Sequence, residues 1–462
     1  MPDFSITSGF LALAERFLHA GARLYGVGGM VRNPLLSLPV SDMDVCSALP
    51  PQEVKALCAG AGIGCKEKGA AFGTLDLTLG GERFEYACFR ADSYGASGAH
   101  RPRNVRFTQS LEEDAIRRDF TVNALYLDPL TGRVTDPTGG LADLAAKRIR
   151  ATSPNPGDIL RDDGLRILRM ARFAAELGFL VEPATLAAAR EHVGGLADIS
   201  PERIAEEWNK LLLSDVRYGM GKESLLYGLH TLKECGVFPV ILPELACCDG
   251  ITQKAQYHAY DVLEHCLHAC ASAPPQLNLR LAMLLHDTGK PVALAHHGKM
   301  HGHEAYSAAM AEDILTRLKY PIALKKEVVE LIRWHMYDLK GEARPRTIKK
   351  RFVQLGKERA LQLCAVREAD VHGSGIITDE VATAARWREI LDEMEQKHAP
   401  FSQSELACTG ADIAFWLNLP PGPKIGQIKR GLLLHCACKP EDNTPERLRA
   451  LAKDIAGGYD HA

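Results

Sequence analysis

The feature that most constrains the fold is a short apolar run near the N-terminus that ends in two glycines. Leu24 to Val27 has the composition of a buried strand, and Gly28 and Gly29 follow it directly. Glycines after a strand let the backbone approach a ligand closely, and the amide groups that open the next helix can hold phosphate oxygens. Arg32, one turn further on, is placed to add a charge-assisted hydrogen bond. The stretch therefore predicts a phosphate-binding turn, although the same pattern also occurs as an ordinary turn.

Two closely spaced carboxylates follow this turn. Val40, Met43 and Val45 suit a strand. Alternate residues of a strand point to the same face, so Asp42 and Asp44 are predicted to project together. Adjacent carboxylates repel each other unless a cation lies between them, and magnesium prefers oxygen ligands. A solvated edge strand is the alternative, but the preceding turn favours a metal site.

Residues 73–79 and 83–89 are strand-like runs joined by Gly80, Gly81 and Glu82, which predicts a β-hairpin. Glu85, on the second run, is either a third carboxylate of the metal site or an exposed strand acid.

Residues 91–106 are polar and rich in glycine, which predicts a mobile loop. Residues 112–125 then predict a helix, with acids ahead of Arg117 and Arg118.

Several motifs, in this order, resemble one known family. Gly28-Gly29-x-Val31-Arg32, Asp42-x-Asp44 and the stretch 117–124, Arg-Arg-Asp-Phe-Thr-Val-Asn-Ala, resemble the class II nucleotidyltransferases. These are the bacterial CCA-adding tRNA nucleotidyltransferases and the related poly(A) polymerases. Residues 162–173 resemble the family's nucleobase-selecting helix, and residues 199–204 resemble the element after it. One departure is Asn33, which stands where the family usually has aspartate, so that a negative charge is lost.

The resemblance implies roles for individual residues. Asp42 and Asp44, with Glu85 as a candidate third acid, would bind two magnesium ions. The triphosphate would be held by Gly28, Gly29 and Arg32.

The same resemblance implies that Asp163 and Arg166 pair with the base edge of CTP or ATP. Arg118, Arg169 and Arg172 would reach phosphate or ribose, or brace the selector. Asp163 and the three downstream arginines recur every three residues, which predicts a winding stripe on one helix. From the residues alone, such a helix equally fits a solvated or salt-bridged face.

A second cluster of histidines and aspartates lies between residues 257 and 375. His265, the His286-Asp287 doublet and Asp370 resemble the ligand set of HD phosphohydrolase domains, with His303 and His335 nearby. Imidazole and carboxylate ligands suit a divalent metal that activates water against a phosphoester. The alternative is an HD fold retained as a scaffold for the tRNA body, with a weak or empty site.

Composition adds few further limits. The 462 residues are 46% hydrophobic and 24% charged, as expected for several globular domains. The formal net charge of −3 excludes a chain coated in positive charge but allows local basic patches. The 13 cysteines lack paired zinc-site spacing, which favours reduced thiols and a cytoplasmic protein. No apolar run reaches the length of about 18 residues that predicts a membrane span.

The expected fold class is α+β, with a small mixed-sheet nucleotidyltransferase head over residues 1–138. An elongated all-helical remainder is expected to follow. It would comprise a nucleobase-selecting neck (139–215), a body with an HD-type domain (216–375) and a tail that contacts the RNA body (376–462).

The resemblance implies template-independent addition of CCA to the 3′ end of tRNA from CTP and ATP, with release of pyrophosphate. The nearest alternative is a poly(A) polymerase, or an enzyme that adds only CC or only A. The length of the 91–106 loop favours a complete CCA-adding enzyme. An HD phosphohydrolase with an inactive RNA-binding head is an alternative of a different class.

We expect a monomer or homodimer that does not bind membranes. Candidate contacts to the RNA backbone are Lys325, Lys326, Lys349, Lys350, Arg351, Lys424, Lys429 and Arg430.

Overall fold

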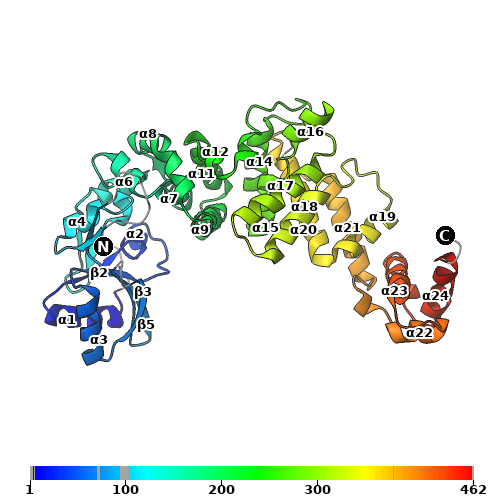
Figure 1. Cartoon of the computed structure of the whole chain (residues 1–462), viewed down its shortest axis with the longest axis horizontal. Helices are drawn as coiled ribbons and strands as arrows, with labels where there is room; N and C mark the ends of the chain where they lie inside the picture. The colour runs from blue at the N-terminus through cyan, green and yellow to red at the C-terminus, as the bar shows by residue number, and fades with distance from the viewer. Residues whose placement is uncertain (1–3, 5, 70–72, 94–103, 378, 460–462) are drawn as a thin grey trace. The chain divides into compact units, whose positions relative to one another are not determined.

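The computed structural model describes residues 4, 6–69, 73–93, 104–377 and 379–459. It divides into two compact units, shown in Figure 1. Unit 1 comprises Met1–Ala246 with Arg317–Lys319, and unit 2 comprises Cys247–Thr316 with Tyr320–Ala462. The expected α+β fold class, with a small mixed sheet followed by helices and an HD domain, is confirmed. Among the described residues, every helix is too short or too polar to cross a bilayer. The expected domain boundaries stay predictions.

A seven-stranded sheet forms the core of the N-terminal part of unit 1, in the order β3-β4-β5-β2-β1-β8-β9. Strands β2 and β5 are parallel, and the other neighbours are antiparallel. The strands are β1 (Leu24–Val27), β2 (Asp44–Ser47), β3 (Gly64–Gly69), β4 (Thr74–Leu79), β5 (Glu82–Cys88), β8 (Tyr126–Asp128) and β9 (Arg133–Thr135).

Two helices beside this sheet are visible in Figure 1, α1 (Ser8–His19) and α3 (Pro51–Ala61). The apolar face of α1 buries Phe10 and Phe17 against β5. Their rings lie 6.2 Å from Phe84 and 5.6 Å from Tyr86, respectively. Burial of these aromatic side chains explains why an amphipathic helix forms here.

The predicted hairpin is confirmed as β4 and β5. Leu79 pairs with Glu82, and the turn between them is Gly80-Gly81, with φ angles of 60° and 83°. Two successive positive φ angles belong to the tight turn that fits the twist of a hairpin.

The loop expected over residues 91–106 is wrong at its ends, because β6 (Arg90–Ser93) pairs with β7 (Asn104–Phe107). The expectation that the length of this loop favours a complete CCA-adding enzyme depends on residues 94–103, which lie outside the described residues.

The helix expected over residues 112–125 is also wrong in length. Helix α4 (Leu111–Ile116) ends early, and Thr121–Asn123 forms a separate 3-10 turn. Between them Phe120 is extended, with φ −131° and ψ 148°, and bridges to Ala151. Tertiary pairing therefore outweighs helix propensity here.

The rest of unit 1 is mainly helical, apart from the short strands β10 (Arg148–Ile149) and β11 (Leu180–Val181). Its helices are α5 (Gly140–Ala145), α6 (Pro156–Asp162), α7 (Leu165–Leu177), α8 (Pro183–His192), α9 (Pro201–Leu212), α10 (Ser214–Arg217), α11 (Lys222–Glu234), α12 (Val237–Ile241) and α13 (Pro243–Ala246).

The described part of unit 2 is built from helices. They are α14 (Val262–Ser272), α15 (Leu277–Leu285), α16 (Lys290–His297), α17 (His303–Arg317), α18 (Ile322–Trp334), α19 (Pro345–Leu355), α20 (Lys357–Gly373), α21 (Ala382–Gln396), α22 (Gly410–Leu417), α23 (Pro423–Cys436) and α24 (Pro445–Tyr459).

Helix α14 packs closely against α20. A Cβ atom at Gly373 would lie 2.6 Å from Ala269, so this approach requires glycine. The close contact brings His265 of α14 and Asp370 of α20 together.

Candidate active sites

A polar cavity of about 530 Å³ in unit 1 gathers most of the residues predicted for nucleotide transfer. Its predicted lining residues are Gly28, Gly29, Arg32, Asp42, Asp44, Glu85, Arg118, Arg169 and Arg172. It is also lined by Asn33, Ser41, Asp119, Asn123, Phe173, Glu176, Glu206, Lys210, Arg217 and Tyr218.

Gly28 joins β1 to helix α2 (Gly29–Leu35) at one wall of this cavity. Its φ of 68° and ψ of −133° suit glycine rather than an L-residue. A Cβ atom at this position would lie 3.4 Å from Asp44 Oδ2. The turn therefore brings bare backbone next to the carboxylate.

The three predicted carboxylates line the same cavity. Asp44 pairs with Glu85 in the parallel register of β2 and β5, and the Glu85 amide donates to the Met43 carbonyl at 2.9 Å. Backbone pairing thus fixes the separation of Asp44 and Glu85. An oxygen-only donor set of this kind suits magnesium.

The expectation that residues 40–45 form one strand is wrong. Strand β2 begins at Asp44, so Asp42 lies before it and is exposed. The neighbouring strand β1 ends at Val27, where the chain turns into α2, and this limits pairing of the residues ahead of Asp44.

Arg32 is buried in the wall of the cavity, with a relative exposure of 4%. Its Nη1 donates to Asn123 Oδ1 at 2.5 Å, and its Nε and Nη2 donate to Asn33 Oδ1 at 3.1 and 2.9 Å. Its guanidinium carbon also lies 5.2 Å from the Phe173 ring centre. These partners are neutral, and burial lowers the pKa of Arg32. A buried cation held by neutral groups suits an anionic ligand.

Asn33, the departure from the family motif, uses both ends of its side chain. Its oxygen accepts from Arg32, while its Nδ2 donates to the Pro39 carbonyl at 2.8 Å and to the Tyr218 hydroxyl at 3.0 Å. The amide therefore holds Arg32 in place and also ties α2 to the segment after α10.

Arg118 reaches the cavity from a buried network centred on Asp114. Asp114 Oδ2 accepts from Arg118 Nη2 at 2.9 Å and from the Tyr126 hydroxyl at 2.8 Å, and Oδ1 accepts from Arg117 Nε at 2.9 Å. Burial raises the pKa of Asp114, but Arg118 and Arg117 outweigh it and lower the value to about 2. Sequence reasoning missed Asp114, although its spacing of three and four residues from the arginines was a usable signal.

The neck arginines Arg169 and Arg172 are held by carboxylates at the cavity edge. Arg169 Nη2 lies 2.6 Å from Asp119 Oδ2. Arg172 Nε lies 2.6 Å from Glu207, and its Nη1 lies 2.9 Å from Glu176. Sequence reasoning also missed these two acids. Glu207 lies far from the arginine run in sequence, and Glu176 lies on the same helix as the arginines, where it resembles an ordinary helix acid.

Asp163 and Arg166 are not among the residues that line this cavity. Asp163 is extended, with φ −147° and ψ 104°, and separates α6 from α7, so the predicted continuous stripe is wrong at its first position. Its Oδ2 accepts from Arg203 at 3.0 Å. Arg166 donates to the carbonyls of Ile159 at 3.0 Å and Arg117 at 2.9 Å.

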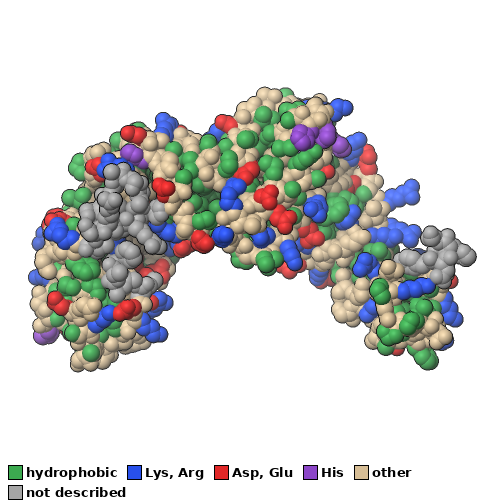
Figure 2. All heavy atoms as spheres, viewed as in Figure 1, with side chains coloured by type: hydrophobic (Ala, Val, Ile, Leu, Met, Phe, Trp, Pro, Cys, Tyr) green, Lys and Arg blue, Asp and Glu red, His purple; other side chains and the backbone are tan. Residues whose placement is uncertain are grey.

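The candidate RNA-backbone residues lie in unit 2, and several already have partners. Lys349 lies 3.0 Å from Glu393, and Arg351 stacks 3.6 Å from the centre of the Trp334 ring. On the face drawn in Figure 2, basic and acidic side chains are interspersed, while histidine side chains gather over α16. His296 and His297 of α16 are both exposed.

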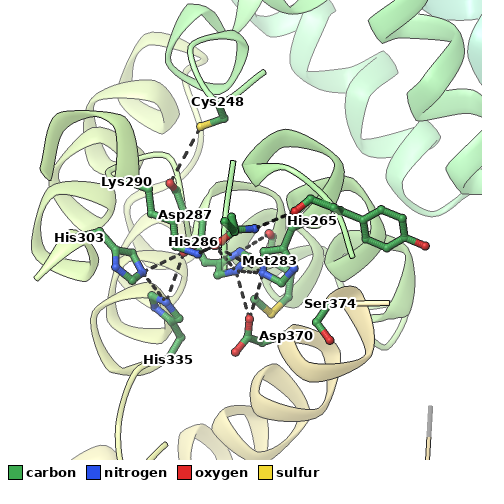
Figure 3. Close-up of polar contacts among 12 residues, drawn as sticks. Cys248, His265, Met283, His286, Asp287, Lys290, His303, His335, Asp370 and Ser374 are labelled. Carbon is green, nitrogen blue, oxygen red and sulfur yellow. Dashed lines mark hydrogen bonds and ion pairs between the residues drawn. The ribbon is translucent and has the colours of Figure 1, made fainter. Parts of the chain in front are cut away.

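A buried polar cluster in unit 2 brings together all the predicted HD ligands (Figure 3). His265 Nε2 lies 3.0 Å from His286 Nε2 and 3.1 Å from Asp370 Oδ1. Asp287 Oδ2 lies 3.4 Å from His265 Nε2 and 3.3 Å from His286 Nε2. The donor atoms converge on one point, and imidazole with carboxylate suits a divalent transition metal.

Charged side chains flank this cluster. Lys290 Nζ lies 2.5 Å from Asp287 Oδ2, and Arg367 Nη1 lies 3.1 Å from Asp370 Oδ2. Burial raises the pKa of Asp287, but His286, Lys290 and His303 outweigh it and hold the pKa well below its usual range. Asp287 therefore stays ionised and ready to bind a cation. Lys290 was not predicted as part of the site.

All thirteen cysteines are free thiols, as expected. Most are buried, and burial raises the pKa of Cys364 to about 12. An unionised thiol of this kind is a packing residue rather than a nucleophile.

Comparison with known proteins finds three family models that match parts of this chain. Residues 24–150 match the model of the poly A polymerase head domain, and residues 178–248 match the probable RNA and SrmB-binding site of polymerase A. Residues 256–371 match the HD domain.

Curated relatives extend over most of the chain. It is 33% identical over 443 residues to the A-adding tRNA nucleotidyltransferase of Deinococcus radiodurans, which covers 92% of this chain and 94% of that protein. It is 33% identical over 371 residues to the multifunctional CCA protein of Alcanivorax borkumensis, covering 76% of this chain and 84% of that one.

A solved structure shares the fold. The CCA-adding enzyme of Bacillus stearothermophilus, in complex with CTP, matches 99% of both chains with a TM-score of 0.70 and 24% identity. Because curated relatives match it over most of their length, the chain belongs to the family of CCA-adding tRNA nucleotidyltransferases and poly(A) polymerases, as a nucleotidyltransferase with an HD domain.

Proposed function

We propose that this enzyme adds the CCA sequence to the 3′ end of tRNA from CTP and ATP and releases pyrophosphate. The observation that carries the proposal is the convergence of three acids, Asp42, Asp44 and Glu85, with the buried cation of Arg32 in one cavity. A catalyst of nucleotidyl transfer needs metal-binding carboxylates beside a site for a triphosphate. The name of one curated relative, A-adding tRNA nucleotidyltransferase, supports tRNA as the acceptor.

The three acids supply only oxygen ligands, so magnesium fits this site. When bound there, magnesium ions would lower the pKa of the attacking tRNA 3′-hydroxyl and stabilise the leaving pyrophosphate. The chain's own residues then position the triphosphate. The backbone at Gly28 and Gly29 approaches its oxygens, and Arg32 supplies a charge that its neutral partners leave uncompensated.

Base selection by Asp163 and Arg166 remains part of the proposal. Asp163 now accepts from Arg203, and Arg166 donates to two backbone carbonyls. Pairing with a nucleotide base therefore requires these hydrogen bonds to be exchanged. Arg169 and Arg172 brace the neighbouring wall, because their carboxylate partners already hold them.

Addition of A alone is the second candidate. The specific observation in its favour is that an A-adding enzyme aligns with 92% of this chain. Both activities use the same acids and the same triphosphate site, so the two candidates differ in nucleotide choice rather than in chemistry.

One experiment separates these candidates. The purified chain is given three tRNAs, ending before CCA, after the first C and after CC, with CTP and ATP singly and together, and the products are sequenced. Complete CCA on the first tRNA supports the proposal. Extension of only the third tRNA by one A supports A addition, long A tails support a poly(A) polymerase, and no extension of any tRNA overturns nucleotidyl transfer.

A second activity is proposed for the HD domain, which is metal-dependent hydrolysis of phosphate esters. The observation that favours it is the buried convergence of His265, His286 and Asp287, which suits a catalytic metal. Asp287→Asn should abolish hydrolysis of a chromogenic phosphate ester and leave CCA addition intact. Hydrolysis that persists in this variant would exclude the HD site as its source.

A further inference from the structure

Tyr218, the residue after helix α10, lines the polar cavity of unit 1 together with Arg32 and Asn33. Its side chain is half-buried, and its hydroxyl oxygen lies 3.0 Å from Asn33 Nδ2. The direction of this hydrogen bond decides what else the hydroxyl can bind. A hydroxyl that donates to residue 33 uses its proton within the protein, whereas a hydroxyl that accepts keeps its proton for another group.

The orientation of the Asn33 amide fixes that direction. Its Oδ1 lies 3.1 Å from Arg32 Nε and 2.9 Å from Arg32 Nη2, and a guanidinium can only donate. Its Nδ2 lies 2.8 Å from the Pro39 carbonyl, which can only accept. Exchange of the amide oxygen and nitrogen would mismatch both partners. Nδ2 therefore faces Tyr218 and donates to it, so the hydroxyl oxygen of Tyr218 is the acceptor.

The other polar neighbours of Tyr218 leave its proton unused. The guanidinium carbon of Arg217 lies 5.4 Å from the centre of the Tyr218 ring, and this side chain can also only donate. Glu176 of the cavity wall already accepts from Arg172 and Arg217. Within the part of the chain that the structure describes, the Asn33 contact is the hydrogen bond that the Tyr218 hydroxyl makes, and there it accepts. The proton is left for an acceptor that enters the cavity.

The position of Tyr218 beside Arg32 identifies the class of that acceptor. The two side chains contact opposite ends of the Asn33 amide and line the same cavity. Arg32 is a buried cation with neutral partners, which suits a phosphate group. A phosphate oxygen has several lone pairs, so it can accept from a neutral phenol as well as from a guanidinium, and hydrogen bonds to an ionised acceptor are the stronger ones.

We propose that Tyr218 donates its hydroxyl proton to a phosphate oxygen of the incoming nucleoside triphosphate. The inference rests on the proposed function and deepens it, because it adds a substrate-binding side chain to the triphosphate site. A contact with phosphate is the same for CTP and ATP, so Tyr218 contributes equally to the binding of both nucleotides.

The amide at position 33 is what leaves the Tyr218 proton available. An aspartate there would offer only acceptor oxygens, so the hydroxyl would donate to it instead. Asn33 therefore has two effects on the triphosphate site. It holds Arg32 through its oxygen, and through its nitrogen it turns Tyr218 into a donor for the ligand.

Equilibrium binding of CTP and of ATP, without tRNA, tests the contact. Isothermal titration calorimetry is carried out on the full chain with Mg²⁺. Tyr218→Phe should weaken the binding of both nucleotides about tenfold, as expected when a hydrogen bond to a charged group is lost. A loss confined to one nucleotide, or no loss for either, would overturn the phosphate contact.

Tyr227→Phe is the matched control. The Tyr227 hydroxyl also accepts from an amide, that of Val181 at 3.0 Å, but Tyr227 is not among the residues that line the cavity. This variant should bind both nucleotides as the natural protein does. An equal loss in the two variants would show that removal of any such hydroxyl perturbs unit 1, and would overturn the specific role of Tyr218.

A fluorinated tyrosine at position 218 separates donation to the ligand from mere support of Asn33. Fluorine on the ring makes the phenol a stronger donor and its oxygen a weaker acceptor. Below the pKa of the phenol, this variant should bind CTP at least as tightly as the natural protein. Weaker binding would mean that Tyr218 acts only as an acceptor for Asn33, which would overturn the proposal. Because the side chain keeps its size, this test holds even if Tyr218→Phe fails to fold, which the thermal unfolding midpoint identifies.

The Asn33→Asp background gives an independent test. The aspartate takes the Tyr218 proton, so adding Tyr218→Phe should change the affinity for CTP by less than about threefold. A larger loss in this background would overturn the donor role.

Failure of this inference is distinct from failure of the proposed function. If the natural protein binds CTP and ATP and Tyr218→Phe binds them equally well, only the role of Tyr218 is overturned. If the natural protein binds neither nucleotide, the triphosphate site itself is overturned, and the role of Tyr218 with it. Extension of tRNA is measured separately on the natural protein.

Discussion

Arg169 donates two hydrogen bonds to one oxygen of Asp119, from Nε at 2.9 Å and from Nη2 at 2.6 Å, and so joins helix α7 to the segment after α4. Burial raises the pKa of Asp119, but Arg169 and Asn123 outweigh it and lower the pKa to about 2. The pair lines the polar cavity of unit 1 and fixes one wall of it.

Removal of Arg169 should therefore destabilise unit 1. Arg169→Ala leaves Asp119 buried without its main partner, and we expect a loss of about 2 kcal/mol in the free energy of unfolding. This loss in the free energy of unfolding is smaller than the loss expected when one partner of a fully buried ion pair is removed, because the Arg169 side chain is 34% exposed. The control is Arg161→Ala, whose pair with Asp158 is exposed and should change stability by less than about 0.5 kcal/mol. Urea unfolding measures the free energy of unfolding of both variants. Equal losses in the two variants would contradict the stabilising role assigned to the pair of Arg169 and Asp119.

Asp42→Ala should abolish nucleotide incorporation, a fall of about 1,000-fold or more, because an acid of the proposed magnesium site is lost. Binding of tRNA, measured by filter retention, should change little, since Asp42 carries no role in holding the tRNA body. Glu53→Ala, an exposed acid on α3, is the control and should leave incorporation unchanged. Retained incorporation by Asp42→Ala would refute the metal assignment.

Gly28 and Gly21 form a matched pair for testing the phosphate-binding turn. Both have positive φ angles, 68° and 82°, but only at Gly28 would a Cβ atom meet a neighbour, Asp44 Oδ2 at 3.4 Å. Alanine at either position should cost about 1 kcal/mol of stability through backbone strain. Only Gly28→Ala should also raise the KM for CTP and lower kcat, measured in primer extension assays. The same kinetic change in Gly21→Ala would show that strain alone is responsible.

Asn33 can be tested with two substitutions that separate its contacts. Asn33→Ala removes the acceptor of Arg32 and both donations from Nδ2, so we expect a loss of about 2–3 kcal/mol. Asn33→Asp keeps the acceptor and loses the donation to the Pro39 carbonyl, so we expect a loss of about 1 kcal/mol. Thermal unfolding and the KM for CTP should rank the aspartate variant between the natural protein and the alanine variant. The reverse order would mean that the negative charge itself is harmful.

The stability of unit 1 should depend on pH through Asp114. Its folded-state pKa is about 2, below the ordinary value of 3.8. The ionised carboxylate therefore contributes its full stabilisation at pH values above 3.8. That contribution, about 2 kcal/mol, is lost as pH falls from about 4 to 2. The difference in unfolding free energy between the natural protein and Asp114→Asn should be full at pH 7 and should begin to shrink below pH 4. A constant difference between pH 7 and pH 3 would argue against the ionised network.

The motifs of the head could be located from the sequence, but their geometry could not. The role of Glu85 stayed open because its partner depends on the parallel pairing of β5 with β2, which are separated by α3 and two further strands. The helix expected through Arg117 and Arg118 was wrong because Asp114 binds both side chains and Phe120 pairs with Ala151. Long-range pairing of this kind leaves no periodic signal in the local sequence.

The HD cluster was more predictable, because its histidines and aspartates recur between residues 257 and 375 and include the His286-Asp287 doublet. Its four named ligands and the two nearby histidines do meet. The contacts of both Asp287 oxygens with histidines, and the contact of Lys290 with Asp287, could not be foreseen, because they depend on how the side chains of α16, α17 and α18 turn inward.

His286 and His335 are the C-cap residues of α15 and α18, and each gives its Nδ1 proton to a carbonyl in the last turn of its own helix. The last carbonyls of a helix lack the usual amide donor four residues ahead, and the Ile332 carbonyl also accepts from the His335 amide at 3.4 Å. The imidazole therefore adds a hydrogen bond at the helix end while its other nitrogen faces the cluster, and rotation of either ring would weaken a helix terminus. Amide exchange at these two termini should slow when the cluster binds an ion, which makes local fraying a direct reporter of the chemistry at the centre.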